Sequence, residues 1–266
     1  EKKRANAIKI MARFLFNELQ KMPLYVAQWN SGKMHNAIPR DGKVIFAVPN
    51  DKKEEVKADW NMFAKDVEEE FHVTDTHMEW NLSSADAQDV IPANTSRNLI
   101  YALQAVDNGV LTMCQDEILA WMVETSSNVA SVQSSDSEVV VVSSQRSNVM
   151  STLDNVCNTV KAAFVLAGAG VEQTDGYPAW QPKHDSKLQK ITIAAYRKLF
   201  GKDPVVRGIH AGLECGLFSE KYPNLDMVSF GPTLRNVHTP DECLYIPTVQ
   251  MVWDHLLEIL KNIPEK

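Results

Sequence analysis

The sequence predicts an α+β protein in which helices lie on one face of an antiparallel sheet. Apolar residues at helical spacing alternate with short apolar runs in the order α-β-β-α-β. The same order then returns without any repeat of residue identity. We therefore expect a first domain at residues 1–175, built from two αββαβ units, and a second segment at 176–266.

The elements of the two units follow from apolar periodicity and from the residues that end each helix. The first helix is closed by Pro23, and a later one is capped by Ser147 and stopped by the glycines of 168–170. The expected elements are, in order, a helix at 4–20, strands at 24–29 and 43–48, a helix at 51–71, a strand at 74–82, a helix from Asn94 or Thr95 to 106, strands at 121–132 and 138–144, a helix at 147–167 and a strand at 171–175.

Residues 176–266 differ in character from the first domain. A Pro-punctuated linker, GYPAWQPKHDS, precedes a helix at 186–200, a strand at 204–209, a turn HAGLECG, a strand at 225–230 and a closing helix at 246–262. This alternation is typical of the last part of an α/β sandwich. With so few strands, the segment should expose much of its apolar face unless something else covers it.

The composition indicates a globular protein with a sizeable core: 44% of residues are hydrophobic and 23% are charged. A net charge of −7 argues against nucleic acid or an anionic membrane as a partner. No apolar run reaches the roughly 18–20 residues that span a bilayer, and the start resembles an amphipathic helix rather than a signal peptide. The four cysteines are scattered without a CxxC pair. These features favour reduced thiols and a cytoplasmic protein.

Glycine, proline, histidine and carboxylate residues gather between residues 207 and 242. His238 lies on a loop just past a predicted strand, where a rigid sheet could hold it as a metal ligand. A capped turn with a partly exposed histidine fits the spacing at least as well, because one histidine does not specify a metal site. Asp241 is close enough in sequence to orient this loop, whereas Glu242 reads as a solvated turn carboxylate.

Two further segments could bind a substrate carboxylate. In HAGLECG, two glycines after a strand let the backbone approach a ligand and offer it N–H groups, although a simple strand-to-helix turn fits equally well. In HNAIPR, the guanidinium of Arg40 could bind a carboxylate in bidentate fashion. The neighbouring Asn36 could equally satisfy its own turn.

The blocks HAGLECGLF, MVSFGPT and HTPDE, followed by an amphipathic helix and IPEK, closely resemble the C-terminus of aminoacyl-histidine dipeptidase. This Xaa-His dipeptidase is a di-zinc metallopeptidase, and the resemblance runs through the whole chain. It implies that residues 1–175 are a lid and dimerisation domain. It also implies that residues 176–266 are the C-terminal part of an α/β zinc-peptidase catalytic domain.

The resemblance assigns roles to particular residues. It implies that His238 is a metal ligand, with Asp241 behind it, and that the turn holds the substrate's C-terminal carboxylate. Asn36 matches a lid asparagine that helps to hold the developing oxyanion, and Arg40 is a plausible carboxylate partner. The substrate-binding residues on this interpretation are Asn36, Arg40, His210, Gly212, Leu213 and Glu214.

The family's other metal ligands and its general base have no match in this sequence. The expectation is therefore a fragment of a zinc dipeptidase that hydrolyses Xaa-His dipeptides with metal-activated water, forms homodimers through the lid, and does not itself retain two zinc ions. One alternative is a non-catalytic lid module acting in self-association or substrate capture. Another is a related dipeptidase with a different substrate.

Overall fold

The computed structural model describes residues 3–115, 120–174, 176, 178, 180, 183, 185–208, 214–237 and 241–264. The chain divides into two compact units, Glu1–Asp175 and Gly176–Lys266.

Unit 1 is built on an antiparallel sheet whose longest strand is β4. This strand pairs with β5 along most of its length, and on its other edge with β3 and then with β1, whose far edge pairs with β2. The strands are β1 (Tyr25–Ser31), β2 (Gly42–Ala47), β3 (Gly109–Met113), β4 (Val123–Ser134) and β5 (Val139–Ser147). Because β4 contacts three other strands, residues on it can position several loops at once.

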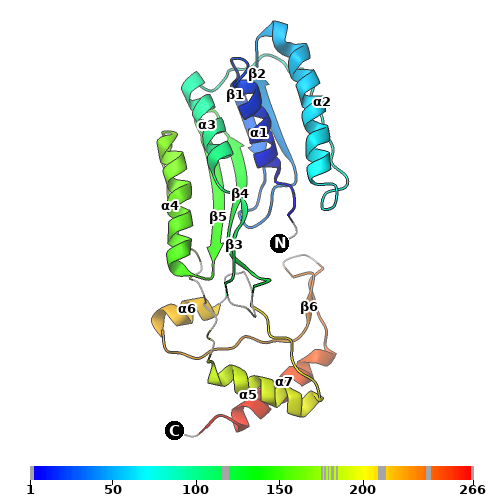
Figure 1. Cartoon of the computed structure of the whole chain (residues 1–266), viewed down its shortest axis with the longest axis vertical. Coiled ribbons are helices and arrows are strands. Elements are labelled where there is room, and N and C mark those ends of the chain that lie inside the picture. The colour runs from blue at the N-terminus through cyan, green and yellow to red at the C-terminus, as the bar shows by residue number, and fades with distance from the viewer. Residues whose placement is uncertain are drawn as a thin grey trace. The chain divides into compact units, whose positions relative to one another are not determined.

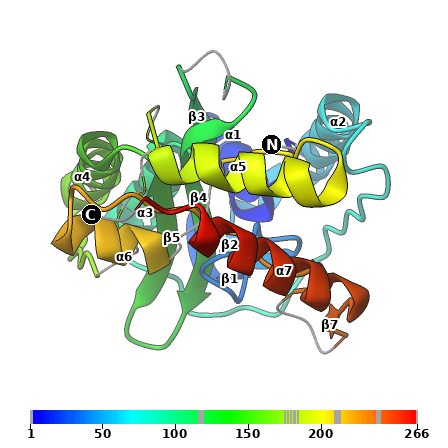
Figure 2. The same ribbon diagram turned by 90° about the horizontal axis from the view of Figure 1, so that it is seen from below.

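Four helices cover one face of this sheet (Figures 1 and 2). They are α1 (Ala7–Leu19), α2 (Lys53–Glu70, preceded by a 3-10 turn at Asn50–Lys52), α3 (Ala93–Ala105) and α4 (Met150–Leu166). Asn6 caps α1 by accepting from the N–H groups of Ile8 and Lys9. Gly168, with φ +82°, ends α4, as the glycines of the sequence predict. The predicted cap at Ser147 is wrong, because Ser147 is the last residue of β5 and α4 begins at Met150 without a side-chain cap.

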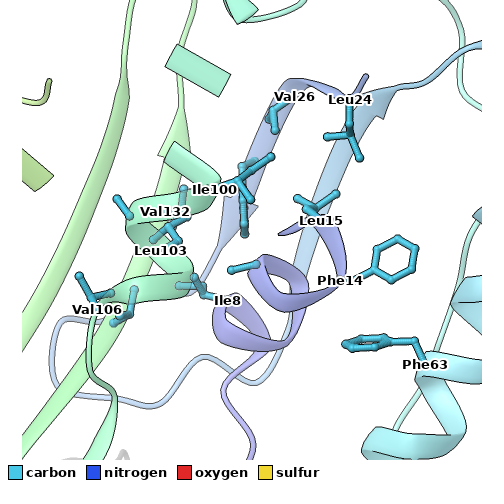
Figure 3. Packing of buried hydrophobic residues seen from close by; sticks show 14 of the residues in the cluster. Ile8, Phe14, Leu15, Leu24, Val26, Phe63, Ile100, Leu103, Val106 and Val132 are labelled. Atoms are coloured by element: carbon cyan, nitrogen blue, oxygen red, sulfur yellow. The ribbon is translucent and has the colours of Figure 1, made fainter. Parts of the chain in front are cut away.

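The core of unit 1 lies between these helices and the sheet. Ile8 and Leu15 of α1, Ile100 and Leu103 of α3, and Val132 of β4 are almost fully buried and converge there (Figure 3). Next to them an aromatic group extends the core towards α2. The Phe14 ring lies 4.9 Å from Trp60 and 5.4 Å from Phe63, measured between ring centroids.

The predicted α+β class with an antiparallel sheet is confirmed, but the two αββαβ units are not regular. Residues 74–82 form no strand. Instead Met78, Trp80 and Leu82 pack against the core, and Trp80 Nε1 donates to Glu68 of α2 at 2.9 Å. Residues 171–174 are also irregular, and residue 175 lies outside the described part. One strand was missed, β3, which begins at Gly109 in a left-handed conformation.

Unit 2 contains three helices and one short hairpin among its described residues. They are α5 (Lys187–Phe200), α6 (Glu214–Lys221), β6 (Leu234–Arg235), β7 (Cys243–Leu244) and α7 (Pro247–Lys261). Ser186 caps α5 through the N–H of Gln189. Residues 204–208 and 225–230, both expected in strands, are irregular because no described strand lies beside them to pair with their backbone.

Helices α5 and α7 pack on each other, but unit 2 buries little apolar surface. Among its described hydrophobic residues, Ala195 and Ile259 are the ones that are buried. Large side chains elsewhere stay exposed, including Val205 at 77% and Trp253 at 55%. The expectation that this segment exposes an apolar face is confirmed.

Candidate functional site

The sequence places Asn36 and Arg40 on the loop between β1 and β2, and the structure shows both side chains exposed. Within the described part of the chain, neither side chain forms a hydrogen bond. The turn itself is closed by the N–H of Ala37, which donates to the Met34 carbonyl at 3.3 Å. The amide of Asn36 is therefore not used up by its own turn, and both side chains are accessible to a ligand.

The backbone of this loop is fixed at several points by neighbouring elements. The Ala37 carbonyl accepts a hydrogen bond from Asn128 Nδ2 of β4 at 2.8 Å. The Pro39 carbonyl accepts from the backbone N–H of Ala7, at the start of α1, at 3.1 Å. At the other end, Gln133 Nε2 donates to the Gly32 carbonyl at 2.7 Å. An exposed loop held in this way presents its side chains from a rigid base.

Asn128 was not singled out from the sequence. It lies in β4 among serines and valines, and its periodicity indicates only that it shares a face with other polar residues. A single sequence contains no signal that its amide reaches a carbonyl 91 positions away.

In unit 2, the predicted metal ligand His238 and the predicted carboxylate-binding residues His210, Gly212 and Leu213 lie outside the described residues. Glu214 is the exposed first residue of α6. Asp241 is exposed, and its backbone carbonyl accepts from Asn236 Nδ2 at 3.3 Å across the β6–β7 loop. The role of Asp241 beside a metal ligand stays a prediction.

The described residues contain no cluster of three or more histidine, cysteine, aspartate or glutamate side chains able to hold a metal ion. His255, to which the sequence assigned no role, is buried and its Nε2 donates to the Thr192 carbonyl at 2.9 Å. Its ring packs against Tyr196 and Phe230, with centroids 5.3 and 5.0 Å away. This histidine joins α7 to α5.

No helix in the described ranges is long and apolar enough to cross a membrane.

Fold and sequence together relate the chain to peptidases, a class of hydrolases. No family model matches it. It is 36% identical over 262 residues to the cytosol non-specific dipeptidase of Escherichia coli (strain K12), covering 98% of this chain and 54% of that protein. The aminoacylhistidine dipeptidase of Vibrio alginolyticus, known from a crystal structure, matches with a TM-score of 0.87 and 36% identity over 99% of this chain and 54% of that one.

The expected resemblance to aminoacyl-histidine dipeptidase is thus confirmed over almost the whole chain. The chain spans about half the length of each of these two relatives.

Proposed function

We propose that this chain is part of a cytoplasmic metallodipeptidase that hydrolyses dipeptides, with Xaa-His dipeptides as the preferred class. The observation that carries the proposal is the relationship to two dipeptidases along nearly the entire chain, with the same fold as one of them. The net charge of −7 fits a small-molecule substrate better than a nucleic acid or an anionic membrane.

On this proposal, unit 1 is the lid and its loop 32–41 contacts the dipeptide. The amide of Asn36 would donate to the oxygen on which negative charge develops as the peptide carbonyl is attacked. The guanidinium of Arg40 would hold the substrate carboxylate by two parallel hydrogen bonds. The exposure of both side chains and the fixed backbone beneath them support these roles.

On this proposal, His238 would be one ligand of a zinc ion, and that ion, when bound, would supply Lewis-acid chemistry for the peptide carbonyl and for water. Because the family's other metal ligands and its general base have no match in this sequence, we propose that most ligands and the general base come from polypeptide outside this chain. In unit 2, the backbone N–H groups of Gly212, Leu213 and Glu214 would donate to the substrate's C-terminal carboxylate, and His210 would contribute to substrate binding. Asp241 would orient the loop that carries His238.

A second candidate function, a non-catalytic lid that self-associates or captures substrate, is favoured by the edge strand β5. Among the described strands, β5 pairs with β4 alone, and its Val140 and Val142 are 46% and 37% exposed. Strand edges of this kind pair with other chains. A homodimer formed through unit 1 would serve either function.

Turnover by the chain alone and turnover by a hybrid enzyme test the two candidates. The purified chain should hydrolyse dipeptides poorly and hold no more than weakly bound zinc. A hybrid in which this chain replaces the matching 262-residue region of the E. coli relative should bind zinc and hydrolyse a panel of Xaa-His and other dipeptides. A folded, zinc-loaded hybrid without turnover would contradict the dipeptidase proposal.

Variants of the hybrid test the individual residues. His238→Ala should remove zinc and activity together, whereas His255→Gln, at a buried histidine of α7 that bonds to α5, should leave the zinc content unchanged. Asn36→Ala should lower kcat by roughly 10²-fold, the usual loss of one oxyanion donor. Arg40→Ala should mainly raise KM.

A further inference from the structure

A buried asparagine, Asn6, joins three parts of unit 1. It is 4% exposed, and its Oδ1 caps α1 by accepting from two backbone N–H groups. Its Nδ2 donates to the Val129 carbonyl in β4 at 2.9 Å and to Asn108 Oδ1 at 3.0 Å. Asn108 Oδ1 in turn accepts from the Val129 N–H at 3.0 Å. Every polar atom of the Asn6 amide is therefore used, and the start of α1 is bonded to β4.

Asn128 continues this group of asparagines towards the candidate substrate loop. Its Oδ1 lies 3.4 Å from Asn6 Nδ2, and its own Nδ2 donates to the Ala37 carbonyl at 2.8 Å. Because Asn6 Nδ2 has two hydrogens and two nearer acceptors, its contact with Asn128 Oδ1 is a shared one, and the orientation of the Asn128 amide is set mainly by its bond to the Ala37 carbonyl. Ala37 follows Asn36 directly, so the peptide bonded to Asn128 lies next to the proposed oxyanion donor.

A second bond fixes the same loop two residues later. Ala7, the residue after Asn6, donates its N–H to the Pro39 carbonyl at 3.1 Å. Two carbonyls of loop 32–41, at Ala37 and Pro39, are thus held by residues that the Asn6 amide keeps in place. Pro39 is buried, although the residues on either side of it in the sequence are exposed, so this point of the loop packs against the rest of unit 1.

We propose that Asn128, held by Asn6, is a positioning residue that orients the turn carrying Asn36. It acts through the backbone of Ala37 and does not itself contact the substrate. The catalytic meaning of this role rests on the function proposed above, but the geometry of the turn can be tested without turnover.

The test uses the full chain with 15N-labelled asparagine and alanine, and the variants Asn128→Ala and Asn128→Asp. The aspartate keeps an acceptor for Asn6 and lacks a donor for the Ala37 carbonyl. Asn98→Ala is the matched control, because Asn98 Nδ2 makes the same kind of bond, to the Ala167 carbonyl at 3.1 Å, between α3 and the end of α4. Heteronuclear NOEs and amide shifts of Asn36 and Ala37 report the order of the turn.

Both Asn128 variants should shift the Asn36 side-chain signals and lower the NOEs of Asn36 and Ala37, and Asn98→Ala should change neither. Titration of the zinc-free hybrid enzyme with the dipeptide Gly-His should show a roughly fivefold weaker Kd for the Asn128 variants than for the wild-type sequence, about the effect of one lost hydrogen bond. Thermal melts show whether each variant is folded. If Asn128→Ala does not fold, Asn128→Asp alone tests the positioning role.

The outcomes separate the two proposals. If turn signals in the folded Asn128 variants match those of the wild type, the positioning role is overturned whatever the affinity. If the hybrid with the wild-type loop binds Gly-His as tightly as the hybrid with Asn36→Ala and Arg40→Ala, while the turn signals change as expected, the positioning role stands and the substrate role of the loop fails.

Discussion

A Cβ atom on Gly32 would lie 2.0 Å from the carbonyl oxygen of Ala130, so the end of β1 approaches the backbone of β4 too closely for any side chain. Gly32 also adopts φ +68°, in the left-handed region that favours glycine. Both constraints apply at the first residue of the loop that presents Asn36 and Arg40. The position of this loop therefore depends on one glycine as well as on its hydrogen bonds.

Gly32→Ala should destabilise unit 1 by more than an ordinary left-handed glycine replacement. Gly168 provides the control, because it has φ +82° but open space where a Cβ would stand. Gly168→Ala should cost about 1–2 kcal/mol for backbone strain, and Gly32→Ala should cost a further 1–3 kcal/mol for overpacking. Urea unfolding followed by circular dichroism measures both. Equal losses would mean that β1 and β4 can separate without cost.

Helices were predicted better than strands, and particular residues show why. Ser186 and the glycines after α4 are local signals for helix boundaries. Helix α5 begins directly after Ser186, and α4 ends just before these glycines. The apolar residues of 74–82 indicate a buried side but not a partner strand, and Trp80 is satisfied by packing and by Glu68. Pairing depends on distant backbone, which periodicity does not encode.

The candidate site, like the fold, was predictable only where its signal is local in the sequence. The exposed loop with Asn36 and Arg40 was found from its sequence motif, whereas Asn6 and Asn128 were not. Their effect comes from bonds that span 123 and 91 positions, from Asn6 to Val129 and from Asn128 to Ala37. An asparagine with such partners cannot be told from a surface asparagine without coordinates.

Lys9→Met should destabilise unit 1, because the Lys9 ammonium closes the end of α3. Its Nζ donates to the carbonyls of Leu103, Gln104 and Val106 at 2.6, 2.9 and 2.7 Å. These carbonyls lack partners within the helix, so losing the cap should cost about 1.5–3 kcal/mol. Lys57→Met, at an exposed lysine paired with Glu54, should cost less than about 0.5 kcal/mol. Similar losses in urea unfolding would show that the cap contributes little.

The wild type and Lys9→Met should also differ in how their stability depends on pH. Burial lowers the pKa of Lys9 from 10.5 to about 8, while Asp107 opposes the shift. Between pH 8 and 10.5 the unfolded chain therefore binds this proton more readily than the folded chain does. The free energy of unfolding should increase as the pH rises through this window. The stability of the wild type relative to Lys9→Met should increase across this window. A stability difference between the two proteins that stays constant or falls across this window would contradict a lowered pKa for Lys9.

Glu18→Gln should alter the pH dependence of stability in the opposite direction. The Glu18 side chain is 1% exposed, its Oε1 accepts from Lys21 Nζ at 2.9 Å, and its Oε2 has no partner in the described structure. Burial raises the pKa of this carboxyl above 4.5, Lys21 lowers it in part, and Asp59 and Glu55 add to the rise. The folded state thus keeps the proton to higher pH, and stability falls as pH rises from 4.5 through the folded pKa.

The glutamine variant lacks this titration, so its stability relative to the wild type should improve as pH rises from 4.5. Glu54→Gln is the control, because Glu54 is exposed and its bond to Lys57 lies at the surface. Melting curves from pH 4 to 8 measure the effect. The prediction fails if the Glu18 variant and the Glu54 variant follow the wild type in parallel.

Exposed apolar residues on α7 should make the full chain associate and bind apolar dyes. His255 and Ile259 face α5, whereas four large side chains at helical spacing lie on the other side and are 38–55% exposed: Val249, Trp253, Leu257 and Leu260. A continuous apolar stripe in water is unusual for an isolated folded unit, and it favours contact with another apolar surface.

The double variant W253Q/L257Q should therefore bind less anilinonaphthalene sulfonate and sediment more nearly as a monomer at high protein concentration. V165Q/L166Q is the matched control, since these two exposed residues adjoin at the end of α4 and make no such stripe. Both double variants should keep the helical signal of the wild type, because none of the four side chains is buried. If the control lowers dye binding and association as much as the α7 variant, general surface hydrophobicity and not the α7 stripe drives association.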